Sequence, residues 1–90
     1  MTILVVGVNH KTAPLQVRDL VAVSSGGLED ALGALRGHVD SGVILSTCNR
    51  SELYSLVPSL AAGTNALLGY MCAYHGVDRR ELAPYVYVYQ

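Results

Sequence analysis

The 90-residue sequence predicts an α+β fold, in which helices pack on one face of a four-stranded antiparallel sheet. Three observations predict it. An apolar, β-branched run opens the chain at residues 3–8, helical patterns separate the later strand-like segments, and the last segment, YVYVYQ, alternates strictly. The order strand, helices, strand, strand, helix, strand is that of a split βαββαβ unit.

The first half of the chain carries one strand and two helices. Residues 3–8 suit a central strand because Ile and Val favour a pleated, buried position. Pro14 fits the first turn of a short helix. The break SSGG follows, and Ser25 is expected to cap a second helix, GLEDALGALRGH, whose leucines and alanines recur at helical spacing.

The second half completes the pattern. GVILST is the second strand, CNRS the turn, and ELYSLV a third strand paired antiparallel with the second. A long helix, LAAGTNALLGYMCAYH, ends at Gly76, and its predicted inner face carries Leu60, Thr64, Leu67, Leu68 and Met71. A helical turn interrupted by Pro84 leads to the last strand. The whole is a ferredoxin-like arrangement.

Composition narrows the class of protein. The chain is 51% hydrophobic and only 14% charged, which predicts one folded domain over residues 1–90. Six basic and seven acidic residues give a net charge of −1 without any Lys/Arg run, which excludes a self-sufficient nucleic-acid binder. No basic leader or membrane-length apolar stretch is present, so we expect a cytoplasmic protein that contacts no membrane. The cysteines and histidines are too scattered to predict a metal site.

The segment STCNRSELY carries the chemistry of the chain. Cys48 follows an apolar strand and precedes Asn49 and Arg50. The guanidinium favours the reactive thiolate and suits a carboxylate, and N–H groups of the turn are placed to cradle an oxyanion. A nucleophile beside a carboxylate clamp predicts acyl chemistry on a substrate with a free carboxyl group. The alternative is that Cys48, like Cys72 on the long helix, is a small core hydrophobe.

A usual cysteine hydrolase needs a base beside the thiol. His10, at the end of the first strand, is the candidate because it can reach the same sheet edge as Cys48. Asn9 and His10 serve equally well to hold their loop by hydrogen bonds, and this alternative stays open. His38 and His75 lie at helix ends and are expected to be solvated.

Two segments together resemble the signatures of a known family. GVNHKTAPLQVRD and STCNRSELY are similar to the two signature stretches of glutamyl-tRNA reductase, at close to the family's spacing. The resemblance continues through YMCAYHGVDRRELAPYVYVYQ and so covers essentially the whole chain. It implies that residues 1–90 are the N-terminal catalytic domain of such an enzyme, with the NADPH-binding and dimerisation domains outside this chain.

The resemblance also implies a reaction. Enzymes of this family reduce the glutamate carried on its tRNA to glutamate-1-semialdehyde with NADPH, for tetrapyrrole (heme and chlorophyll) biosynthesis. The cysteine of TCNR, here Cys48, forms a thioester with the glutamyl group. Thr47 and Arg50 of the same motif lie at the glutamate pocket, where the arginine pairs with a carboxylate. The segment NHKT (Asn9, His10, Lys11 and Thr12) is placed at the pocket edge.

The expected partners follow from the same resemblance. They are glutamyl-tRNA, the protein's own NADPH-binding domain, a second copy in a homodimer, and glutamate-1-semialdehyde aminomutase as the next enzyme. Lys11 is the best candidate for the acceptor end of the tRNA. No segment resembles a GxGxxG turn, so this chain binds no nicotinamide in that way, and the family's active-site histidine lies beyond Gln90.

Two other functional classes remain open on sequence grounds. The first is a non-catalytic βαββαβ module that binds a free amino acid and regulates a partner enzyme, since fold alone does not choose between functions. The second is an RNA-binding module, against which the absence of a basic stripe and of an RNP-like aromatic pattern argues. The tyrosines on the last strand could stack bases, but no basic residues lie between them. Arg79-Arg80 either touch tRNA phosphate or lie in solvent.

Overall fold

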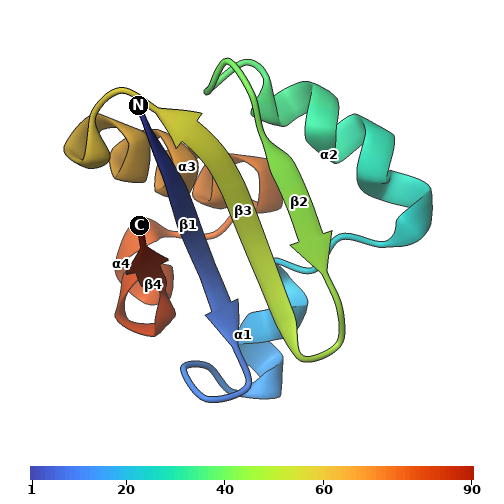
Figure 1. Cartoon of the computed structure of the whole chain (residues 1–90). Coiled ribbons are helices and arrows are strands. Elements are labelled where there is room, and N and C mark those ends of the chain that lie inside the picture. The colour runs from blue at the N-terminus through green and yellow to red at the C-terminus, as the bar shows by residue number, and fades with distance from the viewer.

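Four strands form one antiparallel sheet in the order β2-β3-β1-β4 (Figure 1). The computed structural model describes all of residues 1–90. The strands are β1 (Thr2–Asn9), β2 (Val43–Ser46), β3 (Arg50–Val57) and β4 (Tyr87–Tyr89). β1 and β3 are the central pair and run antiparallel from Thr2 opposite Val57 to Asn9 opposite Arg50.

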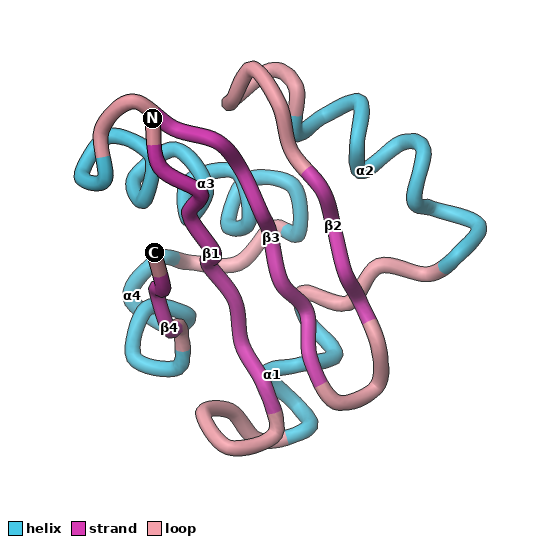
Figure 2. The backbone as a smooth tube through the Cα atoms, viewed as in Figure 1, coloured by secondary structure: helices cyan, strands magenta, loops and turns pink.

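Four helices lie behind this sheet in the view of Figure 2, all on the same face. They are α1 (Leu15–Leu20), α2 (Leu28–Leu35), α3 (Leu60–His75) and α4 (Arg79–Leu82). The α+β, ferredoxin-like prediction is therefore confirmed, including the antiparallel pairing of the second and third strands. No helix is both long enough and apolar enough to cross a membrane.

The core lies between the helices and one face of the sheet. Leu4, Val6 and Val8 on alternate positions of β1 are fully buried, as is Leu67 of α3. Alternation along β1 is what an antiparallel sheet with one covered face requires. Tyr70 of α3 anchors α2 as well, because its hydroxyl donates a 2.8 Å hydrogen bond to the carbonyl of Ala31.

Three details differ from the sequence prediction. Ser24, not Ser25, provides the cap, because its hydroxyl accepts from the N–H of Gly27 and starts a 3₁₀ turn at Ser25–Gly27 that leads into α2. The inner face of α3 is rotated: Leu60 is 39% exposed, whereas Gly63 and Tyr70 are buried. A glycine is needed there because a Cβ on Gly63 would lie 2.8 Å from Val57.

The C-terminal strand is shorter than predicted. Tyr85 belongs to a second 3₁₀ turn at Ala83–Tyr85, and only Tyr87–Tyr89 pair with β1. Gly76 ends α3 with φ of 67°, as predicted for a glycine that follows a helix. Tyr87 pairs with Gly7 of β1. Paired residues point to the same face of a sheet, so the Tyr87 side chain lies on the face that carries no helices.

Candidate active site

The turn between β2 and β3 is closed by the side chain of Thr47. Its hydroxyl oxygen accepts 3.2 Å hydrogen bonds from the backbone N–H groups of both Asn49 and Arg50. The backbone N–H of Thr47 donates to the carbonyl of Arg50 at 2.7 Å. These contacts correct the expectation that N–H groups of the turn cradle an oxyanion, because Thr47 already binds two of them.

Cys48 lies at the tip of this turn and is exposed as a free thiol. The alternative that it is a buried core residue is therefore wrong. Its Sγ lies 3.9 Å from Oδ1 of Asn49, the neighbouring side chain. Cys72 differs: it is partly buried on α3 against the core, and burial raises the pKa of its thiol. The chain thus presents one accessible thiol and one sheltered thiol.

The segment NHKT forms a second turn, at the end of β1. The side-chain oxygen of Asn9 accepts from the backbone N–H groups of Lys11 (2.9 Å) and Thr12 (3.0 Å). In return, the hydroxyl oxygen of Thr12 accepts from the N–H of Asn9 at 3.0 Å. Asn9 therefore holds the loop by hydrogen bonds, as one alternative predicted, but its side-chain partner is Thr12 and not His10, which is exposed together with Lys11.

The two turns meet at one end of the sheet. Asn9 is the register partner of Arg50, so the end of β1 lies beside the start of β3. A surface cavity of about 450 Å³ joins them, lined by Asn9, His10, Thr47, Cys48, Asn49 and Arg50. His10 shares this cavity with Cys48, as expected from its position. Lys11 and Thr12, expected at the pocket edge, are not among the lining residues.

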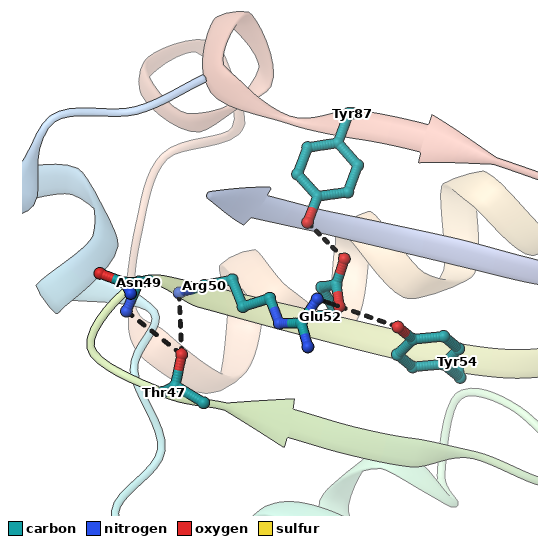
Figure 3. Close-up of polar contacts among 6 residues, drawn as sticks. All are labelled: Thr47, Asn49, Arg50, Glu52, Tyr54 and Tyr87. Carbon is teal, nitrogen blue, oxygen red and sulfur yellow. Dashed lines mark hydrogen bonds and ion pairs between the residues drawn. The ribbon is translucent and has the colours of Figure 1, made fainter. Parts of the chain in front are cut away.

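Next to this cavity, on the face of the sheet that carries no helices, Arg50, Tyr54 and Tyr87 surround the carboxylate of Glu52; these four residues are called the carboxylate cluster (Figure 3). Glu52 is only 6% exposed, although no helix covers this face. Its two carboxylate oxygens accept hydrogen bonds from the hydroxyls of Tyr54 (2.8 Å) and Tyr87 (2.5 Å). Arg50 completes the cluster, with Nη1 3.7 Å from Oε1 of Glu52. Figure 3 shows the Arg50 side chain extending from the turn toward this carboxylate.

The electrostatics of the cluster follow from these contacts. The hydrogen bond to Glu52 raises the pKa of Tyr54, because loss of the phenol proton would set a phenolate against the carboxylate. Burial, followed by the hydrogen bond to Glu52, raises the pKa of Tyr87 well above its usual range. Both tyrosines therefore stay protonated donors, and they hold the carboxylate in place beside Arg50.

Comparison with known proteins agrees with the resemblance seen in the two turns. The family described as "Glutamyl-tRNAGlu reductase, N-terminal domain" matches residues 6–90. The chain belongs to this family. The chain is 41% identical to glutamyl-tRNA reductase from Syntrophotalea carbinolica over 99% of the chain's length. It is 42% identical to glutamyl-tRNA reductase from Pseudoalteromonas translucida over 100% of the chain's length. The chain spans about a fifth of the length of these curated relatives, 20% and 22% respectively.

A second cavity of this N-terminal domain also borders Cys48 and the β2–β3 turn. It measures about 480 Å³ and is lined partly by Arg18, Ser24 and Ser46, together with Thr47 and Cys48. Arg18 of α1 donates a 2.9 Å hydrogen bond from Nη1 to the backbone carbonyl of Cys48. Cys48 therefore lies between two cavities, one with Arg50 and one with Arg18.

Sequence reasoning missed four residues of this domain's site: Arg18, Glu52, Tyr54 and Tyr87. For Glu52 and Tyr54 a signal was available, because residues two positions apart on a strand share a face, so these two side chains are neighbours on β3. For Arg18 no local signal exists, since its partner lies 30 positions away along the chain.

The remaining candidates lie outside the site. His75 was expected to be solvated but is half-buried, and burial lowers its pKa; its ring packs edge-on against Tyr74. Arg79 and Arg80 are exposed, as the alternative that they lie in solvent predicted, and Arg79 is also hydrogen-bonded. Its guanidinium donates to the side chain and backbone oxygens of Asn65 on α3, at 2.8 and 3.1 Å.

Proposed function

We propose that this chain is the thioester-forming domain of a glutamyl-tRNA reductase, with Cys48 as the nucleophile. The Cys48 sulfur attacks the carbonyl carbon of the glutamyl ester, the C–S bond forms, and the bond to the ribose oxygen breaks. The thiol proton ends on that oxygen, and the tRNA leaves. The observation that carries the proposal is the cavity in which an exposed Cys48 and Arg50 face the first signature turn.

Arg50 is proposed to bind a carboxylate of the glutamyl group. Its side chain is 51% exposed while that of Glu52 is 8% exposed, so the guanidinium contacts a buried carboxylate and is also accessible to solvent. A contact of 3.7 Å leaves donors of the fork available for a second carboxylate. Glutamine in place of glutamate would lack the countercharge, and such a difference is worth several kcal/mol in a desolvated site.

His10 and Lys11 take secondary places in the proposal. His10 lines the cavity with Cys48 and is the chain's own candidate for moving a proton at the thiol. Lys11 is exposed next to the same turn, where it suits a phosphate near the acceptor end of the tRNA. Thr47 is proposed to shape the pocket through the turn that it closes.

Reduction of the thioester to glutamate-1-semialdehyde by NADPH is proposed for the whole protein, as an oxidoreductase of tetrapyrrole biosynthesis in the cytoplasm. The residues of this chain do not fit a dinucleotide, because β1 ends in the Asn9 turn instead of a glycine-rich one. No residue here is therefore assigned to NADPH. A separate NADPH-binding domain, a homodimer and transfer to glutamate-1-semialdehyde aminomutase complete the proposal.

Intact-mass spectrometry tests the proposal. The chain is mixed with glutamyl-tRNA, quenched in acid and compared with Cys48→Ser. A glutamyl adduct on the wild type, located on Cys48 by peptide mapping and absent from the variant, is the expected result. Cys72 is the internal control, because it is the sheltered thiol. No adduct, together with reversible binding of free glutamate, would refute the proposal in favour of a regulatory amino-acid-binding module.

A further inference from the structure

Arg18 makes the one side-chain hydrogen bond between α1 and the tip of the β2–β3 turn, residues 47–50. α1 has only six residues, none of them is fully buried, and Val17 is the one that packs against the core, so the helix has little apolar packing. Two further hydrogen bonds join the segment after α1 to the β2–β3 hairpin. Ser51 donates to the carbonyl of Val21 and the N–H of Val23 donates to Ser46, both at 2.9 Å. These two hold the strands, whereas Arg18 holds the turn.

The contact fixes a particular peptide group. The carbonyl of Cys48 accepts from Arg18, and the N–H of Asn49, on the same peptide, donates to Thr47. A peptide group is planar, so binding both its ends fixes its orientation. This plane is attached directly to the α-carbon that carries the thiol. Its orientation therefore sets the direction in which the Cys48 side chain leaves the turn.

The position of the Arg18 side chain leaves one of its nitrogens buried without a hydrogen-bond partner, which is energetically unfavourable. This nitrogen is Nε, the only such side-chain atom in the chain. Orphaned buried donors are rare in folded proteins and call for an explanation. The side chain contributes nothing to the apolar core, so the explanation we favour lies in what the other end of the guanidinium does.

We propose that Arg18 is a positioning residue for the Cys48 nucleophile. It orients the Cys48–Asn49 peptide through the carbonyl of Cys48 and keeps the thiol directed toward the acyl carbon. This inference rests on the proposed function, in which Cys48 attacks the glutamyl ester. Arg18 itself does not bind the glutamyl group, because it does not line the cavity that contains Arg50.

The test compares Arg18→Ala and Arg18→Lys with Arg36→Ala, a matched loss of an exposed arginine at the end of α2. Single-turnover formation of the glutamyl adduct is measured against glutamyl-tRNA concentration. We expect the maximal rate of Arg18→Ala to fall at least about tenfold, since small misplacements of reacting groups have effects of this size. The half-saturating concentration should stay constant, and lysine should restore much of the rate.

Two outcomes would overturn the role. One is a maximal rate for Arg18→Ala equal to that of Arg36→Ala. The other is an unchanged maximal rate with a raised half-saturating concentration, which would make Arg18 a tRNA-binding residue. If Arg18→Ala does not fold, as judged by circular dichroism, Arg18→Lys decides: it should be faster than Cys48→Ser and slower than wild type, and a wild-type rate would refute positioning by the guanidinium.

A second measurement does not depend on the proposed function. Alkylation of Cys48 by iodoacetamide and hydrogen exchange of the Asn49 amide are followed in the same variants. We expect slower alkylation and faster exchange in Arg18→Ala, with the amide of Leu53 in β3 unchanged. Should wild type form no adduct, the proposed function fails, and equal alkylation and exchange in wild type and Arg18→Ala would then refute the inference separately.

Discussion

Gly7 is the position at which one added methyl group tests the whole carboxylate cluster. It lies on β1 opposite Glu52, and its missing side chain lets Glu52 cross the sheet. A Cβ built on Gly7 would lie 2.7 Å from the carbonyl oxygen of Ser51 and 2.9 Å from Cγ of Glu52, whereas ordinary contacts begin at 3.4 Å. Gly7→Ala must therefore move the β3 backbone at Ser51 and Glu52, and the Glu52 side chain with it, by about half an ångström.

The magnitude follows from two opposing effects. Overpacking of this kind costs about 1–3 kcal/mol. The alanine returns about 0.4–1 kcal/mol because it restricts the unfolded chain. We expect a net destabilisation of about 1–2 kcal/mol, which for a domain of this size lowers Tm by roughly 5–15 °C. The displaced carboxylate should also lower the pKa of Tyr54, whose shift depends first on Glu52.

Thermal unfolding by circular dichroism measures the first effect, and the pH dependence of tyrosinate absorbance measures the second. Gly33→Ala is the matched control. It lies in α2, where an added Cβ meets nothing within 4 Å, so alanine should raise stability by about 1 kcal/mol through helix propensity. If Gly7→Ala melted at or above the wild-type temperature, the assigned packing of Glu52 over Gly7 would be wrong.

Three further predictions concern titration and packing. Glu52→Gln should lower the pKa of Tyr54 and Tyr87, the two tyrosines that donate hydrogen bonds to Glu52. Their raised pKa in the folded state favours folding, and this stabilisation is lost as pH rises past about 10. Urea midpoints at alkaline pH should therefore fall less for the variant than for wild type. His75, whose pKa is lowered by burial, holds fewer protons folded than unfolded, so stability should fall as pH drops below about 6.5, and His75→Gln should flatten that slope. Leu67→Ala, at a fully buried position, should cost about 2–5 kcal/mol in urea unfolding, and Leu60→Ala on the exposed side of α3 much less. Equal costs for the two leucines would contradict the observed rotation of α3.

The fold was predictable because its signals are local. β-branched apolar residues mark β1, partial alternation marks β3, and glycine marks the end of α3 at Gly76. The face of α3 was assigned wrongly because hydrophobicity alone does not distinguish Leu60 from Gly63, whose burial depends on its approach to Val57. Helix faces set by close backbone approach cannot be read from the pattern of apolar residues.

The site was predictable only in part, for a related reason. Cys48, Arg50 and His10 could be selected from the sequence because they are reactive or charged residue types at the ends of predicted strands. The structure places all three in one cavity. Arg18 and Glu52 act through partners that only the tertiary structure supplies. An arginine in a six-residue helix looks like an ordinary surface residue until its partner is known, and the hydrogen bond between Glu52 and Tyr87 joins residues 35 positions apart in the chain.

The pairing of Asn9 with Arg50 links the site to the sheet as a whole. The two turns come from opposite halves of the chain and adjoin only when the central strands β1 and β3 are in register. A slip of a single residue would turn every side chain of one strand to the opposite face and dismantle the cavity. Because such long-range pairing forms late and together, the reactivity of Cys48 should serve as a sensor of correct sheet assembly during refolding.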